Sequence, residues 1–79
     1  MRIKCDRVVD GLIPSESIVC ITTHDGSEEV VVHSGLVQDM FLFVGNVLGR
    51  DAGKALVELP RESASGKWRV WVPEAALAT

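Results

Sequence analysis

Short apolar runs, broken at regular intervals, are the feature that most limits what this chain can fold into. The clearest runs are rich in β-branched or aromatic side chains and cover residues 17–23, 28–33, 54–59 and 68–72. Glycine, proline, aspartate or serine separates such runs roughly every eight to twelve residues, a spacing typical of small β-barrels and sandwiches. No segment repeats its apolar residues at the spacing of a long helix. The sequence therefore predicts an all-β domain.

The turn residues indicate where strands end. Asp25-Gly26 is the strongest hairpin signal, because both residue types tolerate the positive φ of a tight turn. Residues 50–53 predict a second turn. Pro73 ends the last predicted strand, since proline supplies no backbone donor, and residues 74–77 suit one short helical turn after it.

The stretch 36–48 fits either a strand or a helix. Its centre, Met40 to Val44, is a continuous apolar run that periodicity alone does not assign. A helix would place several apolar residues on one face and would end at Gly49. Gly45 in the middle, with valine and phenylalanine around it, favours a strand kinked or bulged at Gly45. We predict the strand; the alternative is an α+β fold with a helix at about 36–48 packed on an antiparallel sheet.

The chain carries more apolar side chain than a small core can hold. Its 79 residues make a single small domain, 1–79, near the lower limit for a self-sufficient core. Hydrophobic residues make up 47% of the chain, and the mean hydropathy is +0.23. Apolar side chains left outside usually meet a partner. We expect the chain to associate with itself, as a homodimer or a higher homo-oligomer, or with another protein.

The net charge indicates which partners the surface attracts, and the cysteines indicate the cellular compartment. The formal net charge is −3, and an acidic or neutral surface does not attract phosphate, so nucleic acid is not the expected partner. No apolar run approaches the roughly 18 residues of a membrane span, and the N-terminus lacks the apolar segment of a signal peptide. Cys5 and Cys20 are therefore expected to be reduced, small core residues on neighbouring strands of a cytoplasmic protein.

No segment of the sequence has the residue spacing of a known catalytic, metal-binding or nucleotide-binding motif. Residues 49–54 have the glycines and lysine of a phosphate loop, but three residues separate the glycines instead of four, and Ala55 follows the lysine. The cysteines and histidines lack the close paired spacing of a zinc site. We predict no metal site, no cofactor and no catalytic residue within the chain.

The segment 68–72, Trp-Arg-Val-Trp-Val, carries the strongest functional signal. Strand alternation places Trp68 and both valines on one face, predicted to be the core side, and Arg69 and Trp71 on the other. Tryptophan and arginine are enriched in interface hot spots. The alternative is that Trp71 packs under the N-terminal segment of its own chain. The predicted partner-binding residues are Trp71, Arg69, Met40 and Leu42.

The second half of the chain also follows a recognisable pattern. It comprises Gly45-x-Val47, Gly53-x-Ala55-x-Val57-Glu58-Leu59, Trp68-x-Val70-x-Val72-Pro73 and Leu77. This pattern resembles the small Src-homology-3-like barrels. The resemblance covers residues 28–77 and implies five or six short strands in a barrel with a short C-terminal helical turn. Residues 1–22 would then be an N-terminal addition, either an edge strand or an arm exchanged in a dimer.

Three functional hypotheses follow. The leading one is a non-enzymatic small β-barrel that acts as a self-associating protein-binding or assembly module. The second is a nucleic-acid-binding barrel or small regulator that uses basic loops of the second half with Trp71 as a stacking surface. Its binding residues would be Arg50, Lys54, Arg61 and Lys67. The third is an oligomeric enzyme whose active site is shared between subunits.

Overall fold

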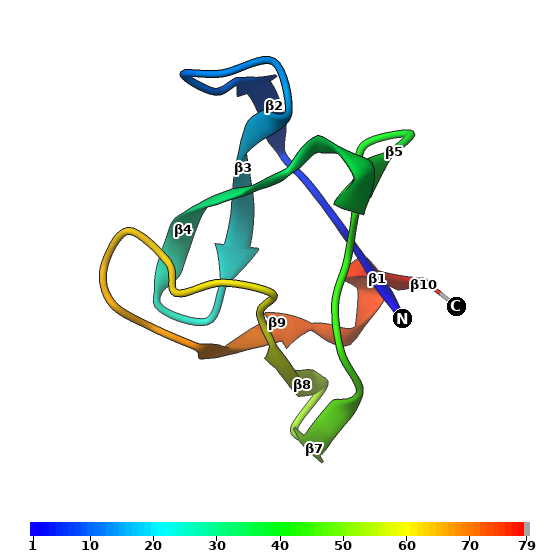
Figure 1. Cartoon of the computed structure of the whole chain (residues 1–79). Helices are drawn as coiled ribbons and strands as arrows, with labels where there is room; N and C mark the ends of the chain where they lie inside the picture. The colour runs from blue at the N-terminus through cyan, green and yellow to red at the C-terminus, as the bar shows by residue number, and fades with distance from the viewer. Residues whose placement is uncertain (79) are drawn as a thin grey trace.

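The computed structural model describes residues 1–78 and shows an all-β domain, which confirms the predicted class (Figure 1). Thr79, the last residue of the predicted domain, lies outside the described residues. The strands are β1 (Arg2–Lys4), β2 (Arg7–Asp10), β3 (Glu16–Thr23), β4 (Gly26–His33), β5 (Val37–Gln38), β6 (Phe41–Phe43), β7 (Val47–Asp51), β8 (Lys54–Glu58), β9 (Arg69–Pro73) and β10 (Leu77–Ala78). Two 3₁₀ turns are η1 (Ser34–Leu36) and η2 (Glu74–Ala76), the second of which confirms the predicted C-terminal helical turn.

The strands form three antiparallel sheets. The first has the order β10-β1-β6-β5, the second β2-β3-β4 and the third β7-β8-β9. Within the described chain none of these sheets closes on itself, so the predicted closed barrel of five or six strands is not found. Residues 1–78 form more strands than the five or six predicted because turns interrupt the apolar runs, and a bulge between Val47 and Gly49 interrupts the third sheet.

Single backbone hydrogen bonds join the sheets at their edges. Between the first and second sheets, the Cys5 N–H donates to the Met40 carbonyl and the next N–H donates to the Cys20 carbonyl, both at 2.8 Å. The His24 N–H donates to the Trp71 carbonyl at 2.8 Å and links the second sheet to the third. The Gly45 N–H reaches the Glu58 carbonyl and links the third sheet to the segment after β6. The three sheets therefore surround one interior.

The hairpin of β3 and β4 has the longest ladder of the molecule. Its register runs without a break from Glu16 opposite His33 to Thr23 opposite Gly26. The hairpin prediction is confirmed, but its turn lies one residue earlier than expected, at His24 and Asp25. Of the predicted pair, Gly26 has a positive φ of 125° and Asp25 does not.

The stretch 36–48 is not a helix, so the α+β alternative is wrong. It contains β5, β6 and the start of β7 in place of the single strand predicted, and Gly45, where a kink or bulge was predicted, lies between β6 and β7. Asp39 and Met40 turn the chain between β5 and β6 with φ values of 53° and 66°. After β6 the Val44 N–H donates to the Met1 carbonyl at 3.0 Å and the Gly45 N–H to the Glu58 carbonyl at 3.3 Å, so neither makes the i to i−4 bond of a helix.

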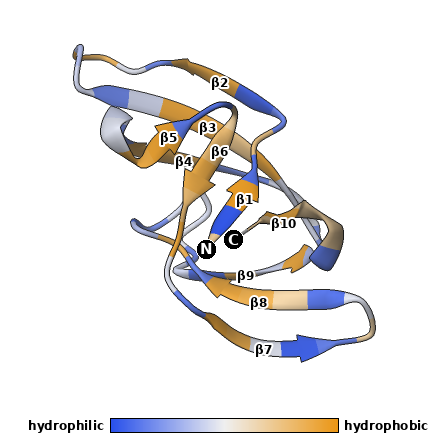
Figure 2. Cartoon of the chain, turned by 90° about the vertical axis from the view of Figure 1, so that its right-hand side faces the viewer, coloured by the Kyte–Doolittle hydropathy of each residue, from blue (hydrophilic) through white to orange (hydrophobic). Residues whose placement is uncertain are grey.

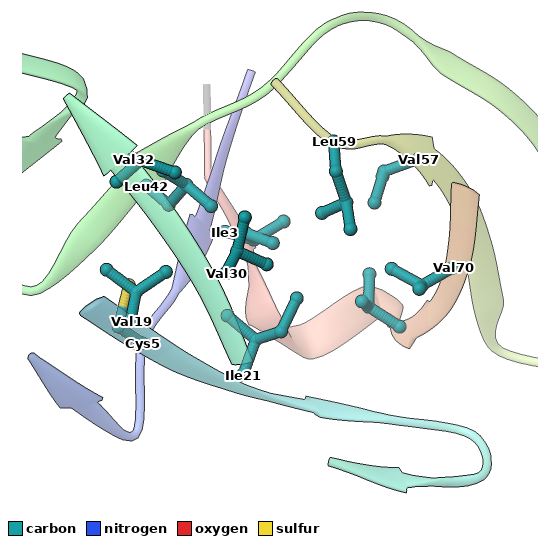
Figure 3. Packing of buried hydrophobic residues seen from close by; sticks show 11 residues of the cluster. Ile3, Cys5, Val19, Ile21, Val30, Val32, Leu42, Val57, Leu59 and Val70 are labelled. Carbon is teal, nitrogen blue, oxygen red and sulfur yellow. The ribbon is translucent and has the colours of Figure 1, made fainter. Parts of the chain in front are cut away.

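All three sheets contribute to one apolar core (Figure 3). Most of its members are valine or isoleucine, which pack well on a pleated surface. The buried cluster comprises Ile3, Cys5, Val19, Ile21, Val30, Val32, Leu42, Val57, Leu59, Val70 and Val72. The segment 1–22 supplies several of these side chains, so it is part of the same core as the segment 28–77.

The two cysteines are free thiols in different surroundings. Cys5 is buried between β1 and β2, and Cys20 is half-buried on β3 opposite Arg7. Burial raises the pKa of the Cys5 thiol to about 11, with smaller contributions from Asp6 and Cys20. Cys5 is therefore protonated and unreactive near neutral pH.

The C-terminal strand returns to the first one. β10 pairs with β1, with Leu77 opposite Ile3, so the two ends of the described chain lie side by side. The described residues contain no helix of the length and apolar character that crossing a membrane requires.

A pair of leucine variants tests the assignment of the core. Leu42 is fully buried, whereas Leu48 on β7 is 47% exposed. We expect Leu42→Ala to lower the free energy of unfolding by about 2–4 kcal/mol through lost burial and a cavity, and Leu48→Ala by less than about 1 kcal/mol. Urea unfolding followed by circular dichroism measures both. Equal losses would place Leu42 outside the core.

Candidate interaction surfaces

Strand β9 shows the predicted alternation from Arg69 onward. Val70 and Val72 are buried, Arg69 is exposed and Trp71 is half-buried on the outer face. Trp68 does not join the core as predicted. It is 54% exposed because the strand begins only at Arg69, and its indole N–H donates to Glu62 at 3.1 Å.

Trp71 covers a glycine of its own chain. In the register of the third sheet Trp71 lies opposite Leu56, and Leu56 lies opposite Gly49 on the edge strand β7. A Cβ placed at Gly49 would lie 3.9 Å from Cη2 of Trp71, so the indole reaches across β8 to this glycine. The edge glycine gains an apolar neighbour, and much of Trp71 serves packing within the chain.

A groove of about 290 Å³ lies between the β3–β4 turn and β9. It brings together three predicted binding residues, Trp71, Arg69 and Lys67, with Asp25 and the buried Thr23. Both cations already have partners, because Lys67 pairs with Asp25 at 3.2 Å and Arg69 with Glu58 at 3.2 Å. The groove is therefore close to charge balance.

Met40 and Leu42 lie apart from that groove, on the first sheet. Met40 is exposed in the turn before β6, but Leu42 is fully buried and does not belong to any surface, which corrects the prediction. Leu42 faces inward because alternation in β6 turns Phe41 and Phe43 outward. The guanidinium of Arg2 stacks over the Phe41 ring at 5.0 Å from its centroid.

The second sheet presents an apolar row on its outer face. Val9 lies opposite Ile18, and Ile18 lies opposite Val31, so these three side chains line up across β2, β3 and β4. Val9 and Val31 are exposed and Ile18 is half-buried. All three alternate with core residues, which fixes them on the side away from the interior.

The loop after β2 is also apolar and exposed. Leu12 is 96% exposed and Ile13 is 52% exposed, at the end of the molecule where the β2–β3 hairpin turns (Figures 1 and 2). Backbone hydrogen bonds from Gly11 to the Glu16 carbonyl and from Glu16 to the Ile13 carbonyl hold the loop in shape. Sequence analysis did not identify this loop as a surface.

The four basic residues of the second hypothesis do not gather at one place. Arg50 pairs with Glu74 at 2.7 Å, and Lys67 pairs with Asp25. Lys54 Nζ lies 3.4 Å from Nδ1 of His24. Arg61 is exposed in the loop after β8, away from the β7–β8 hairpin that carries Arg50 and Lys54. Salt bridges within the chain thus neutralise part of the charge that a phosphate backbone would need.

A buried carboxylate is the main polar feature that sequence analysis missed. Glu28 faces inward on β4, and its two oxygens accept the Ser65 hydroxyl at 2.7 and 2.9 Å. Lys67 Nζ lies 3.8 Å away. Hydrogen bonds from Ser65, then Ser63, lower the pKa of Glu28 below its usual value of 4.5, although burial opposes them. The inward position of Glu28 could have been predicted from the alternation of the strand, because Glu28 lies two and four residues before the core residues Val30 and Val32.

Among residues 1–78, no three histidine, cysteine or acidic side chains lie close enough together to hold a metal ion. Comparisons of the chain with protein-family models, with curated proteins and with solved structures gave no match. The surfaces of the molecule are therefore the source of any functional argument.

Two glycines of the β7–β8 hairpin test the packing of Trp71. Gly49 has open space up to the indole, whereas Gly53 occupies a tight turn with φ of 78°. We expect Gly49→Ala to raise the free energy of unfolding by about 0.5 kcal/mol, and Gly53→Ala to lower it by about 1 kcal/mol or more. Thermal unfolding measures both, and a loss of stability in Gly49→Ala would contradict the position of the indole.

The pH dependence of stability tests the buried carboxylate. Because the folded-state pKa of Glu28 is lowered, its stabilising contribution is complete above the unfolded-state pKa and is lost as pH falls through the folded-state value. We expect wild type to lose more stability than Glu28→Gln between about pH 7 and about pH 3. Ser65→Ala should reduce the loss in the same direction, because the Ser65 hydroxyl donates to the Glu28 carboxylate. Parallel curves for wild type and Glu28→Gln, measured by urea unfolding, would contradict this assignment.

Proposed function

We propose that this chain is a non-enzymatic binding or assembly module that associates with copies of itself. The exposed apolar side chains are the observation that supports this proposal. The large hydrophobic residues with 37% or more of their surface exposed are Val9, Leu12, Ile13, Val31, Met40, Phe43, Leu48 and Trp68. These residues lie on several outer surfaces around one small core. Exposed apolar surface of this extent is usually buried by a binding partner.

We propose further that the fold is an open relative of the Src-homology-3-like barrels. The arrangement that supports this is three short antiparallel sheets, joined by backbone hydrogen bonds at their edges, around one core. The 3₁₀ turn before the last strand is a second point of likeness. A fold of this kind hosts many functions, so the surfaces and not the fold support the assignment.

The groove beside Trp71 and Arg69 is a second place where another protein could insert a side chain. Arg69 is bound to Glu58 and Trp71 covers Gly49, so a partner there would have to compete with existing contacts. For this reason self-association is the leading function. The two free thiols fit a reducing compartment such as the cytoplasm.

Sedimentation equilibrium of the untagged protein tests self-association. We expect the apparent mass to rise from that of the 8.6 kDa monomer toward a closed oligomer as the protein concentration increases. The rise should persist at high salt, because burial of apolar surface drives it and salt does not screen that term. A mass that stays at the monomer value up to millimolar concentration would contradict the proposal.

A further inference from the structure

We infer that the outer face of the second sheet binds the same face of a second copy, with a twofold axis running along β3. This inference rests on the proposed self-association and adds the surface, the symmetry and the residue pairs. Three observations lead to it: an apolar row, a pair of opposite charges that form no ion pair within residues 1–78, and the way a twofold axis brings these together.

The face has an apolar centre and opposite charges at its two sides. Val9, Ile18 and Val31 form the apolar row. In the neighbouring row, Arg7 on β2 lies opposite Cys20, and Cys20 lies opposite Glu29 on β4.

Arg7 and Glu29 are both exposed, and within the described chain neither is within 4.0 Å of an opposite charge. Because β3 separates them, about 10 Å of sheet lies between their strands, too far for a direct pair.

A twofold axis along β3 makes this face complementary to itself. Rotation about that axis places β2 against β4 of the second copy and leaves β3 against β3. Val9 then meets the partner's Val31, Ile18 meets the partner's Ile18, and Arg7 meets the partner's Glu29. The symmetry forms the Arg7–Glu29 pair twice, as an isologous interface requires.

The other twofold arrangement of the same face lacks this match. An axis across the strands through Ile18 would place Arg7 against the partner's Gly11, with no acid to pair with. Charge complementarity therefore selects the axis along β3, since an unpaired charge at an interface costs affinity and like charges repel.

The outer faces of the other two sheets fit a second copy less well. The strands of the first sheet carry the exposed Lys4 and no acidic residue, so two copies would bring like charges to the same face. On the third sheet Trp71 packs over Gly49, and Arg69 already pairs with Glu58. Of the three sheets formed by residues 1–78, the second is the one that combines an exposed apolar row with charges of both signs that form no ion pair there.

The size of the face sets the expected affinity. The three strands are paired side by side over the four residues of β2, which gives a face of about 14 Å by 14 Å. An interface of this size is at the weak end of specific protein interfaces, so we expect a dimer that forms only at high protein concentration. The exposed Leu12 and Ile13 lie in the loop that joins β2 to β3, and a second copy that contacts them would enlarge the interface.

Charge reversal tests the residue pairs. We expect Arg7→Glu and Glu29→Arg each to raise the dimer dissociation constant about tenfold or more, because each replaces two attractive pairs by two repulsive ones. The double variant Arg7→Glu/Glu29→Arg should restore dimerisation to near the wild-type value. Arg61→Glu makes the same change in net charge in the exposed loop after β8 and should have little effect.

A gain of affinity provides an independent check. Glu16 lies on the same face of β3, one row beyond Ile18, so the axis brings it near the partner's Glu16. We expect Glu16→Gln to tighten the dimer about two- to threefold by removing this repulsion. A shift in the opposite direction would contradict the position of the axis.

Cross-linking locates the axis directly. In the variant Cys5→Ala, Cys20 is the only thiol, and the symmetry places it opposite the partner's Cys20. Sheets that pack face to face lie about 10 Å apart, so the two sulfur atoms should lie within reach of dibromobimane, a short bifunctional thiol reagent, although too far apart for a relaxed disulfide. We expect a covalent dimer in this variant that Arg7→Glu suppresses.

The outcomes separate the two proposals. A wild-type dimer that Arg7→Glu does not weaken, and that dibromobimane does not cross-link, would overturn this interface and leave self-association standing. A protein that stays monomeric at every concentration would overturn both. Restoration of the dimer by the double charge reversal, with cross-linking through Cys20, would establish the face and its symmetry.

Discussion

No sheet of this molecule is large enough to bury its own apolar face, and the rest of the structure depends on that constraint. The three sheets have three or four strands each. Their inward-facing valines and isoleucines are shielded from water because all three sheets pack around the same core. The first strand and the last pair with each other, so the two ends of the described chain help to close the same interior. A large cavity anywhere in this shared core should therefore weaken every sheet.

The shared core also determines which side chains remain outside. Strict alternation places every second residue of β2, β3 and β4 outward, and several of these residues are apolar. On the third sheet the outer face carries contacts within the chain, such as the Arg69–Glu58 pair and the indole over Gly49. The outer face of the second sheet has an exposed apolar row, and its Arg7 and Glu29 form no ion pair within residues 1–78. These two properties are the basis of the proposal that this face binds a second copy.

Sequence alone predicted features that depend on local periodicity and turn chemistry. The all-β class, the β3–β4 hairpin and the inward valines of β9 follow from alternation and Gly26. Trp68 was misplaced because alternation does not show where a strand begins. Leu42 was assigned to a surface because a continuous apolar run does not show which residues face inward. The row of Val9, Ile18 and Val31 needs the register of three strands, which depends on turn lengths that the sequence leaves open.

A dilution series followed by ¹⁵N–¹H NMR tests the central claim that the outer face of the second sheet binds a second copy. The account predicts that amide shifts change with concentration along β2, β3 and β4, most strongly near Ile18, Arg7 and Glu29. It predicts little change in the β7–β8 hairpin or near Phe41. Shifts that do not depend on concentration, or that change mainly at the first or third sheet, would contradict the account.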